Sequence, residues 1–449
     1  MKKTIREDDG DINWFRAASP YINAHRGKTL VIAMPGSWLR SELLPTLTHD
    51  LTLLSHLGLR LVLCFGLRAQ MEDQLAQDQE QSDIVDGRRV TDSHALETII
   101  SAAGVARNDL ESRLSMGLPN TPMAGARLAV TSGNYVTAQP FGIRDGIDFQ
   151  HTGSVREVHS SAINAILDAG HMVLLPPLGY SLTGEVFNVT VAEVATECAI
   201  ALKADKLAFF VDSLPLDEDG SPLRQASSRR IERVLNNPSQ ADKTDSSNMT
   251  LNTILNHAVK ACQGDVERVH LLESDDPTAL LRELFTRDGS GTLITMDRWE
   301  HIRPATIADV GGIIELIAPL QTNGTLVTRS REDLELDIEN FVVSERDGMV
   351  VACAAIYLEP ETATAEFACI VTHPDYQGEG RADQLLMHLE ERARELNCVS
   401  ARILSTHTGH WFVARGYYET SRQELPPARR VSYNEQRNSK IYSKRLDLT

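Results

Sequence analysis

The chain has 449 residues, with 62 acidic against 44 basic side chains and a formal net charge of −18. This charge excludes electrostatic binding to nucleic acid or anionic lipid, because neutralising phosphates requires clustered lysine and arginine. The length predicts two or three domains, and the six cysteines contain no Cys-x-x-Cys pair, which argues against a disulfide framework or a zinc ribbon.

The first ten residues are polar and charged, and no stretch reaches the roughly 18 apolar residues that a membrane span requires. We therefore expect a cytoplasmic protein with no nucleic-acid or membrane partner. His407 and His410 have a metal-like spacing, but no suitably spaced carboxylate or cysteine accompanies them, so we expect no metal site.

Short apolar runs alternate with segments of helical period through residues 1–297, which predicts an α/β fold with a mostly parallel sheet covered by helices on both faces. Strands are expected at residues 28–34, 59–65, 128–131, 171–176, 206–211, 268–272 and 293–296. Helices are expected at residues 48–57, 251–262 and 278–285, the first of them ended by Gly58. The polar segment 216–248 is expected to be a loop or a mobile insertion.

The pattern restarts near residue 302, so we expect a first domain at residues 1–297, a linker at about 298–301 and a second domain at 302–449. After the linker the expected helices are at residues 307–320, 383–396 and 410–415, and the expected strands at 302–306, 341–344, 349–357, 365–372, 400–405 and 440–445. This order suits largely antiparallel strands around a central V-shaped split.

The segment 373–382 (HPDYQGEGRA) lies between an apolar strand and a helix. Its glycines, Gly378 and Gly380, allow a sharp turn whose backbone amides, together with the helix dipole, would bind an anion such as a pyrophosphate. The dinucleotide fingerprint Gly-x-Gly-x-x-Gly and the P-loop pattern are both missing here. Taken alone, a glycine pair after a strand is more often an ordinary turn.

The Gln-x-x-Gly-x-Ala spacing at residues 377–382, the restart at Arg303 and the closing segment 410–417 (HWFVARGY) resemble the GNAT acetyltransferases. The front two-thirds resembles the amino-acid kinase fold, through residues 31–36, 87–92, 188–190 and 283–292. In this order the two domains resemble the bacterial N-acetylglutamate synthase family, and residues 19–28 resemble its N-terminal signature. The resemblance implies transfer of acetyl from acetyl-CoA to the α-amino group of L-glutamate, the first step of arginine biosynthesis.

The resemblance also implies that acetyl-CoA is a co-substrate and that no cofactor is tightly bound. It assigns the pyrophosphate to the turn Gln377, Gly378, Glu379, Gly380, Arg381 and Ala382. The pantetheine arm is expected to pair with backbone amides around Ile370 and Val371.

Acetyl transfer needs a base that takes a proton from the glutamate ammonium group and an acid that protonates the leaving thiolate. The resemblance assigns the base to Glu366, although a solvated strand carboxylate is the ordinary interpretation of such a residue. Phe412 stands where many GNAT enzymes have tyrosine, so the resemblance favours Ser405 as the acid, with Thr406 or Tyr418 as alternatives.

The two carboxylates of glutamate require cations, because burying an unpaired carboxylate is very unfavourable. The resemblance matches Arg329 and Arg437 to this role, with Lys440 as the alternative to Arg437, and assigns Ser405 and Cys369 to the substrate site. Strand alternation would place Cys369 on the face opposite Glu366, unless a β-bulge re-aims one of them.

The first domain lacks groups that phosphoryl transfer requires. Ala33 stands where kinases of this fold carry lysine, and Ala192 stands where they carry a carboxylate. The domain is therefore expected to be catalytically silent, while residual nucleotide binding stays open.

The resemblance implies that the first domain binds L-arginine as an effector, at Tyr21, His270, Glu283, Thr286 and Gly289. From spacing alone, a solvated Glu283 and a strand-capping His270 would be the ordinary interpretation. The sign of the arginine effect stays open, and the family resemblance predicts a homo-oligomer, namely a hexamer.

Two other functions stay open from the sequence. One is an N-acetylglutamate kinase, which Ala33 and Ala192 disfavour. The other is an arginine-responsive interaction protein with an inactive acetyltransferase domain, which Glu366 and the glycine turn disfavour.

Overall fold

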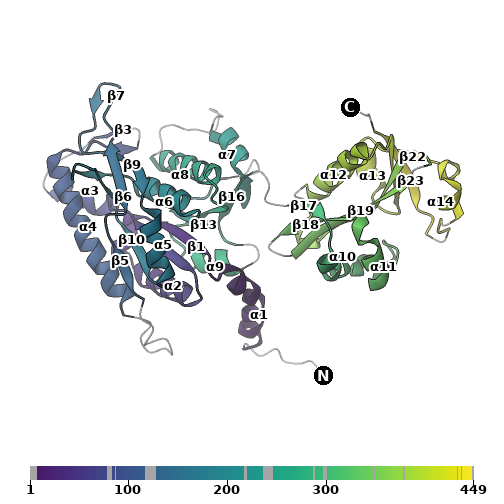
Figure 1. The fold of residues 1–449 in the computed structure, drawn as a ribbon, viewed down its shortest axis with the longest axis horizontal. Helices are drawn as coiled ribbons and strands as arrows, with labels where there is room; N and C mark the ends of the chain where they lie inside the picture. The colour runs from purple at the N-terminus through teal and green to yellow at the C-terminus, as the bar shows by residue number, and fades with distance from the viewer. Residues whose placement is uncertain are drawn as a thin grey trace. The chain divides into compact units, whose positions relative to one another are not determined.

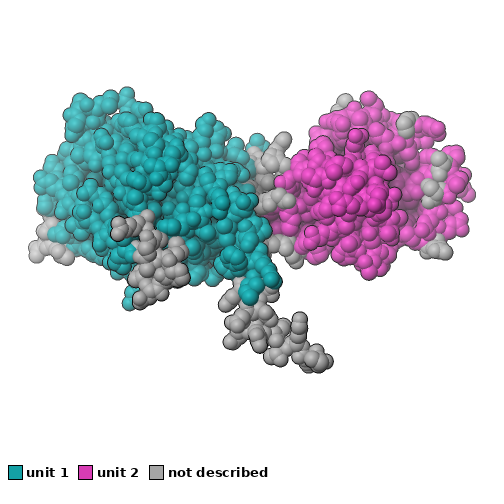
Figure 2. All heavy atoms as spheres, turned by 60° about the horizontal axis from the view of Figure 1, so that its bottom comes forward, with its two compact units in different colours: residues 1–297 teal, residues 298–449 magenta. Residues whose placement is uncertain are grey.

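The computed structural model describes residues 8–77, 83–85, 87–116, 128–216, 220–235, 246–286, 289–296, 301–346, 349–359, 361–377, 380–431, 433–435 and 437–446. The chain divides into two compact units, residues 1–297 and 298–449 (Figure 2). Each unit has its own sheet and its own cores, and the two are described separately below.

An eight-stranded sheet in the order β14-β16-β15-β13-β1-β2-β10-β5 forms the centre of the first unit. Its strands are β1 (Thr29–Met34), β2 (Arg60–Phe65), β5 (Val130–Ser132), β10 (Met172–Leu175), β13 (Lys206–Val211), β14 (Gln225–Ser227), β15 (Arg268–Glu273) and β16 (Thr292–Thr295). Every neighbouring pair is parallel except β15 with β16. The predicted α/β fold with a mostly parallel sheet is confirmed.

Helices cover both faces of this sheet (Figure 1). Val31 and Ala33 of β1 face a core that includes α5 (Ser160–Asp168), α6 (Val191–Leu202) and α8 (Ser246–Gln263). Leu30, Ile32 and Met34 face the opposite core, which is built from α1 (Asp8–His25), α2 (Leu44–His56), α3 (Arg68–Gln77), α4 (Ser93–Leu114) and α9 (Ala279–Phe285). This alternation explains why β1 is apolar along its whole length: both of its faces are buried.

Several short strands of the first unit were not predicted. A four-stranded sheet has the order β12-β11-β6-β9 and consists of β6 (Val136–Pro140), β9 (Gly153–Val158), β11 (Leu178–Tyr180) and β12 (Val186–Asn188). Two hairpins pair β3 (Ile84–Val85) with β4 (Arg88–Arg89), and β7 (Ile143–Arg144) with β8 (Ile147–Asp148). Strands this short leave little periodic signal in a sequence.

The prediction of a loop at residues 216–248 is wrong for its central part. Residues 225–227 form β14, and α7 spans Ser228–Leu235. Ala226 of β14 and Ile231 of α7 are buried in the core beside α8. These apolar contacts pack both elements against the core, although most of their residues are polar. Residues 217–219 and 236–245 lie outside the described part of the chain.

The second unit contains a seven-stranded sheet in the order β17-β18-β19-β20-β21-β23-β22. Its strands are β17 (His301–Pro304), β18 (Phe341–Arg346), β19 (Met349–Glu359), β20 (Thr364–Thr372), β21 (Ser400–Ser405), β22 (Tyr418–Thr420) and β23 (Lys440–Arg445). Its helices are α10 (Val310–Thr322), α11 (Arg331–Asp337), α12 (Arg381–Glu395), α13 (Gly409–Val413) and α14 (Pro427–Val431). Leu385 and Leu389 of α12 pack on one face, and Ile313 and Ile317 of α10 pack on the other.

The sheet of the second unit splits between its two central strands. β20 and β21 are its single parallel pair, and they are in register from Thr364 with Ser400 to Phe367 with Ile403. Beyond that point β20 continues beside β19, and β21 continues beside β23. The predicted V-shaped split therefore opens after Phe367, and it leaves backbone groups of residues 368–372 facing the gap.

Five short 3₁₀ helices complete the described secondary structure: η1 (Gly36–Arg40), η2 (Ile307–Asp309), η3 (Ile338–Asn340), η4 (Pro374–Tyr376) and η5 (Arg422–Glu424). Among the helices that the structure describes, none combines the length and the apolar composition needed to cross a bilayer.

Asp50 in α2 predicts a pH dependence of stability. Burial raises the pKa of its carboxyl group from 3.8 to about 7, so the folded state keeps a proton that the unfolded chain releases. Stability is therefore lost as the pH rises from about 4 through about 7. Asp50→Asn is expected to raise the melting temperature at pH 8 by roughly 5 °C and to change it little at pH 4. Thermal denaturation at both pH values measures this, and an equal gain at both would contradict it.

Candidate active site and effector site

Glu366 lies in β20 at the point where β20 and β21 begin to diverge. Its side chain is buried, with 8% of the residue exposed. Both carboxylate oxygens accept hydrogen bonds from Arg429 of α14, from Nε at 2.7 Å and from Nη2 at 2.8 Å. This pairing raises the pKa of Arg429 above its ordinary value. Glu366 is thus a buried, ion-paired carboxylate, and the ordinary interpretation of a solvated strand residue is wrong.

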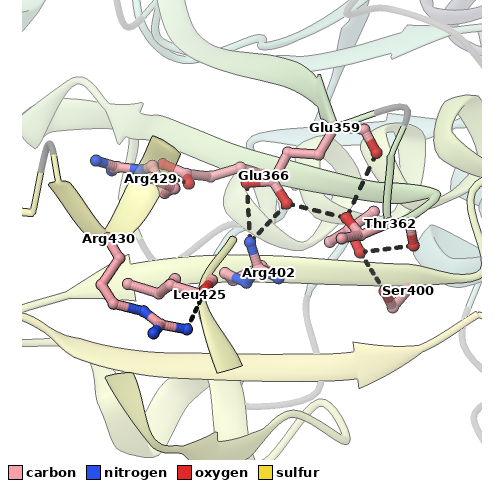
Figure 3. Close-up of polar contacts among 9 residues, drawn as sticks. Glu359, Thr362, Glu366, Ser400, Arg402, Leu425, Arg429 and Arg430 are labelled. Carbon is pink, nitrogen blue, oxygen red and sulfur yellow. Dashed lines mark hydrogen bonds and ion pairs between the residues drawn. The ribbon is translucent and has the colours of Figure 1, made fainter. Parts of the chain in front are cut away.

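A second ion pair lies beside it on the same sheet. Arg402 of β21 is the register neighbour of Glu366, but its Nη1 donates to both oxygens of Glu359, at 2.9 and 2.7 Å (Figure 3). Arg402 therefore pairs with Glu359, and Arg429 is the cation that neutralises Glu366.

Arg329 lies in the connection between α10 and α11, against the same face of the sheet as Glu366. Its Nη1 donates to the hydroxyl of Tyr357 at 2.7 Å and to Asp337 at 3.2 Å, and its guanidinium lies 5.6 Å from the centroid of the Tyr357 ring. Tyr357 in turn donates to Asp337 at 3.1 Å and stands opposite Glu366 in the β19–β20 register. Arg329 is therefore fixed in place, and Tyr357 links it to the face that carries Glu366.

Cys369 is turned by a β-bulge. Its backbone has φ of 52°, and the register of β19 with β20 shifts by one residue between Cys353 and Ala355. Cys369 consequently packs in the core beside α10 while Ile370 packs against the opposite core. Alternation alone would place Cys369 on the α12 face, so the bulge brings it to the face of Glu366 and Arg329.

The thiol of Cys369 has an unusual electrostatic setting. A hydrogen bond from the thiol of Cys353 lowers the pKa of Cys369, burial opposes this effect, and the positive charge of Arg329 adds to it. Cys353 is fully buried, and its Sγ lies 3.7 Å from the carbonyl oxygen of Cys369. Cys369 is therefore a buried thiol whose pKa is lowered by Cys353 and Arg329.

The glycine turn precedes α12. Gly380 has φ of 78° and is the N-cap residue of this helix, whose first backbone amides lie next to the turn. The Nε2 of Gln377 donates to the carbonyl of Thr372 at 3.2 Å, and the buried guanidinium of Arg381 donates to the carbonyl of Tyr376 at 2.8 Å. The side chains thus shape the turn and leave the helix amides for an anion, while Gly378 and Glu379 lie outside the described residues.

Ser405 ends β21, on the other arm of the split from Glu366. Its Oγ accepts the backbone N–H of Thr408 at 3.1 Å and lies 2.9 Å from the Thr408 hydroxyl. The hydroxyl therefore closes the turn after β21, and either hydroxyl of the Ser405–Thr408 contact can be the donor. Tyr418, the alternative acid, is exposed on the edge strand β22.

Arg437 reaches the loop that carries Arg329. Its Nη2 donates to the carbonyl of Thr325 at 2.6 Å, and its Nε is buried with no hydrogen-bond partner among the described residues. A buried N–H without a partner is costly, and a ligand carboxylate would satisfy it. Lys440, the alternative to Arg437, is exposed and pairs with Glu419.

Three of the five residues predicted for the effector meet in the first unit. His270 Nδ1 lies 2.7 Å from Glu283 Oε1, and Glu283 Oε2 accepts the backbone N–H groups of Ser290 at 2.7 Å and Gly291 at 2.9 Å. Burial raises the pKa of Glu283, but the bonds from His270 and the two amides outweigh burial and lower it to about 2. Gly289 has φ of 62°, and a Cβ there would overlap the Glu283 carboxylate.

The other two predicted effector residues lie on the neighbouring helices. Tyr21 belongs to α1, which His25 ties to α9 through a 2.7 Å contact with the Leu284 carbonyl. Thr286 ends α9, and its hydroxyl donates to the carbonyl of Arg282 at 2.6 Å. The Nε2 of His270 is buried with no hydrogen-bond partner among the described residues, so this atom can form a hydrogen bond with a bound ligand.

Gly36, which follows β1, packs closely against Gly66 and Gln70. Gln70 Nε2 donates to the carbonyl of Gly36 at 2.6 Å, and a Cβ on Gly36 would lie 2.8 Å from the Gly66 carbonyl oxygen. Ala33 and Ala192 are both buried and carry no charge. Among the described residues no group of three or more His, Cys, Asp or Glu side chains is placed to hold a metal ion.

Comparisons with known proteins agree with this two-part organisation. The amino acid kinase family model matches residues 28–273, and the acetyltransferase (GNAT) family model matches residues 314–420. Over 436 residues the chain is 45% identical to the amino-acid acetyltransferase of Pseudomonas syringae pv. tomato, covering 97% of this chain and 99% of the relative. The chain belongs to the amino-acid acetyltransferase family. The enzyme of Pseudomonas fluorescens SBW25 has the same identity and coverage.

Two solved structures match this member of the amino-acid acetyltransferase family over 97% of its length, each at 35% identity and with 99% of the solved chain covered. Both are N-acetylglutamate synthase from Neisseria gonorrhoeae, with coenzyme A and L-arginine in one (TM-score 0.84) and coenzyme A and N-acetyl-glutamate in the other (TM-score 0.62). The predictions of an amino-acid kinase fold joined to a GNAT domain and of an acyltransferase enzyme are confirmed.

Sequence reasoning did not identify Tyr357, Asp337 or Arg429, although all three pair with predicted site residues of this acetyltransferase. Tyr357 was detectable in principle, since a polar aromatic residue ends the apolar run 350–356. Arg429 lies 63 positions from Glu366, and no spacing rule links the two.

Proposed function

We propose that the chain transfers the acetyl group of acetyl-CoA to the α-amino group of L-glutamate, and that L-arginine regulates it through the first unit. The observation that carries this proposal is the position of Glu366, a buried carboxylate where β20 and β21 diverge, on the same face as Arg329 and Cys369. The ligands of the two gonococcal structures support it.

In the proposed reaction, Glu366 takes a proton from the ammonium group of glutamate, directly or through a water molecule. The neutral amine attacks the thioester carbonyl, so a C–N bond forms while the C–S bond breaks. Backbone amides near Ile370 and Val371 polarise the carbonyl, because β20 faces the split there without β21 as a partner. Ser405, on the other arm of the split, gives its proton to the departing thiolate, and the second proton that the amine nitrogen loses as the amide forms restores the Ser405 hydroxyl.

The glycine turn is proposed to hold the pyrophosphate of acetyl-CoA. The left-handed conformation of Gly380 directs the first amides of α12 toward the turn, and a helix N-terminus favours an anion. Asp383 in the first helical turn would repel a phosphate, but Arg415 pairs with it.

The carboxylates of glutamate are proposed to be bound by the arginines of the same face. Arg329 is held by Tyr357 and Asp337, and Arg437 has a spare buried N–H. Cys369 lies at the bulge beside Arg329, where it lines the site.

L-arginine is proposed to bind in the first unit at His270, Glu283 and Gly289, flanked by Tyr21 and Thr286. The carboxylate of Glu283 would pair with the guanidinium group of the effector. By family resemblance, we also propose that the chain forms a homo-hexamer and works in the cytoplasm.

Glu283→Gln is expected to weaken L-arginine binding at least 30-fold, since it removes the charge that pairs with the effector while keeping the side-chain shape. Calorimetric titration with L-arginine measures this, and acetylation without arginine should stay within about threefold of the wild type. Glu273→Gln, an exposed carboxylate at the end of the same strand β15, is the matched control. Binding of L-arginine at wild-type affinity by Glu283→Gln would place the effector elsewhere.

The kinase alternative is disfavoured by Ala33 and Ala192, which are buried and uncharged where kinases of this fold carry lysine and a carboxylate. A thiol-release assay tests the proposal directly: with acetyl-CoA present, free coenzyme A should accumulate on addition of L-glutamate and not on addition of ATP. Thiol release that ignores L-glutamate would contradict the proposed function.

A further inference from the structure

Tyr357 and Asp337 form a closed set of hydrogen bonds with Arg329. The Nη1 of Arg329 donates to the Tyr357 hydroxyl at 2.7 Å and to Asp337 Oδ2 at 3.2 Å, and that hydroxyl donates to the same Asp337 oxygen at 3.1 Å. The three residues belong to β19, to the end of α11 and to the connection before α11. An ion pair with Asp337 alone would neutralise Arg329, so the effect that the Tyr357 hydroxyl adds is on the orientation of the guanidinium.

This set of hydrogen bonds leaves one edge of the guanidinium without a partner. A guanidinium carries five N–H groups, and the two on Nη1 match the two bonds to Tyr357 and Asp337. Among the described residues, Nε and Nη2 of Arg329 have no hydrogen-bond partner. These two nitrogens present parallel N–H groups at the spacing of the two oxygens of a carboxylate.

The surroundings of Arg329 hold this edge in one direction. The guanidinium lies 5.6 Å from the ring centroids of both Phe341 and Tyr357, and the Arg329 side chain is 22% exposed. Burial raises the pKa of Tyr357 to about 12, so the hydroxyl keeps the proton that it donates to Asp337 and accepts from Arg329. The donor and the acceptor of each bond are therefore fixed, and the guanidinium has little freedom to rotate.

We propose that Tyr357 and Asp337 are positioning residues for acceptor recognition: by holding both N–H groups of Nη1, they direct the Nε–Nη2 edge of Arg329 to one carboxylate of L-glutamate. This inference rests on the proposed function and deepens it, because it explains how Arg329 selects a carboxylate. An amide has a single acceptor oxygen and would turn its own N–H groups toward those of Arg329, and an acceptor without that carboxylate would leave the edge unpaired.

The test measures kcat/KM for L-glutamate and for two analogues that each differ at one carboxylate. L-glutamine has an amide in the side chain, and 4-aminobutyrate lacks the α-carboxylate. Tyr357→Phe removes only the hydroxyl, so it is expected to raise the KM for L-glutamate about 10-fold and to leave kcat within about threefold of the wild type. The preference for L-glutamate over one analogue should fall about 10-fold, and the preference over the other should change by less than threefold. The analogue affected identifies the carboxylate that Arg329 binds.

Two variants of Asp337 separate orientation from charge. In Asp337→Asn the amide oxygen can still accept from both Arg329 and Tyr357, so the KM for L-glutamate should rise by less than about threefold. Asp337→Ala removes both bonds and should raise this KM about 10-fold or more. An equal rise in the two variants would show that the charge of Asp337 matters and its hydrogen bonds do not, which would overturn the inference.

Tyr417→Phe is the matched control for Tyr357→Phe. The Tyr417 hydroxyl also bonds to a buried carboxylate, that of Glu390 at 3.0 Å, but it lies in the core on the α12 face. This variant should lower the melting temperature and leave both preferences unchanged. If Tyr357→Phe kept both preferences, or lowered both equally, Tyr357 would be a structural support only. Failure of the wild type to acetylate L-glutamate is a separate result, which would overturn the proposed function itself.

Discussion

Replacing Glu366 with glutamine is expected to lower kcat by about 10²–10⁴-fold while the KM for L-glutamate changes by less than threefold. Glutamine keeps the volume of the side chain and one acceptor oxygen for Arg429, but it cannot take the proton from the ammonium group. Steady-state thiol release at saturating acetyl-CoA measures both constants. The loss should shrink as the pH approaches the pKa of the free amine, where more of the glutamate arrives already neutral.

Glu359→Gln is the matched control for this prediction. Glu359 is the other carboxylate of the same sheet network, and it pairs with Arg402 and not with Arg429 (Figure 3). Its replacement should lower the melting temperature and leave kcat within about threefold of the wild type. If kcat fell equally in both glutamine variants, the loss would come from disruption of the ion-pair network and would not identify Glu366 as the base.

Replacing Arg329 with alanine is expected to raise the KM for L-glutamate at least 30-fold, because removing one member of a buried charge pair costs about 2 kcal/mol or more. The KM for acetyl-CoA should change by less than threefold, since Arg329 faces Tyr357 and Asp337 and not the glycine turn. Initial rates with each substrate varied in turn separate the two constants.

Arg331→Ala provides the comparison for Arg329. Arg331 lies two residues further along the chain, is exposed, and pairs with Glu335 within α11. Its loss should leave both KM values near those of the wild type. If Arg329→Ala raised the KM for acetyl-CoA as much as the KM for L-glutamate, the substitution would have distorted the whole site.

The sequence predicted the elements whose residues repeat regularly. Val31 and Ile32 lie in a strand that is buried on both faces, so its apolar run indicated a parallel sheet, as the structure confirms. The V-shaped split followed from the order of helices and strands after Arg303, together with the GNAT resemblance carried by the turn at Gly380.

Other features depend on contacts that no local pattern encodes. Ala226 and Ile231 are isolated apolar residues in a polar segment, and only the core beside α8 makes them part of a strand and a helix. Cys369 changes face because the backbone turns left-handed there, whereas strand alternation alone predicts the opposite face. Arg429 meets Glu366 through a long connection, so its role was visible only in three dimensions.

One incubation tests the central claim most directly: the protein with L-glutamate, acetyl-CoA and ATP together, and the products resolved by mass spectrometry. N-acetyl-L-glutamate and free coenzyme A should form in equal amounts while ATP is recovered intact, and Glu366→Gln should slow the formation of both products by about 100-fold or more. Consumption of ATP with a phosphorylated product, or acetyl transfer that Glu366→Gln leaves unchanged, would contradict this assignment of the two units.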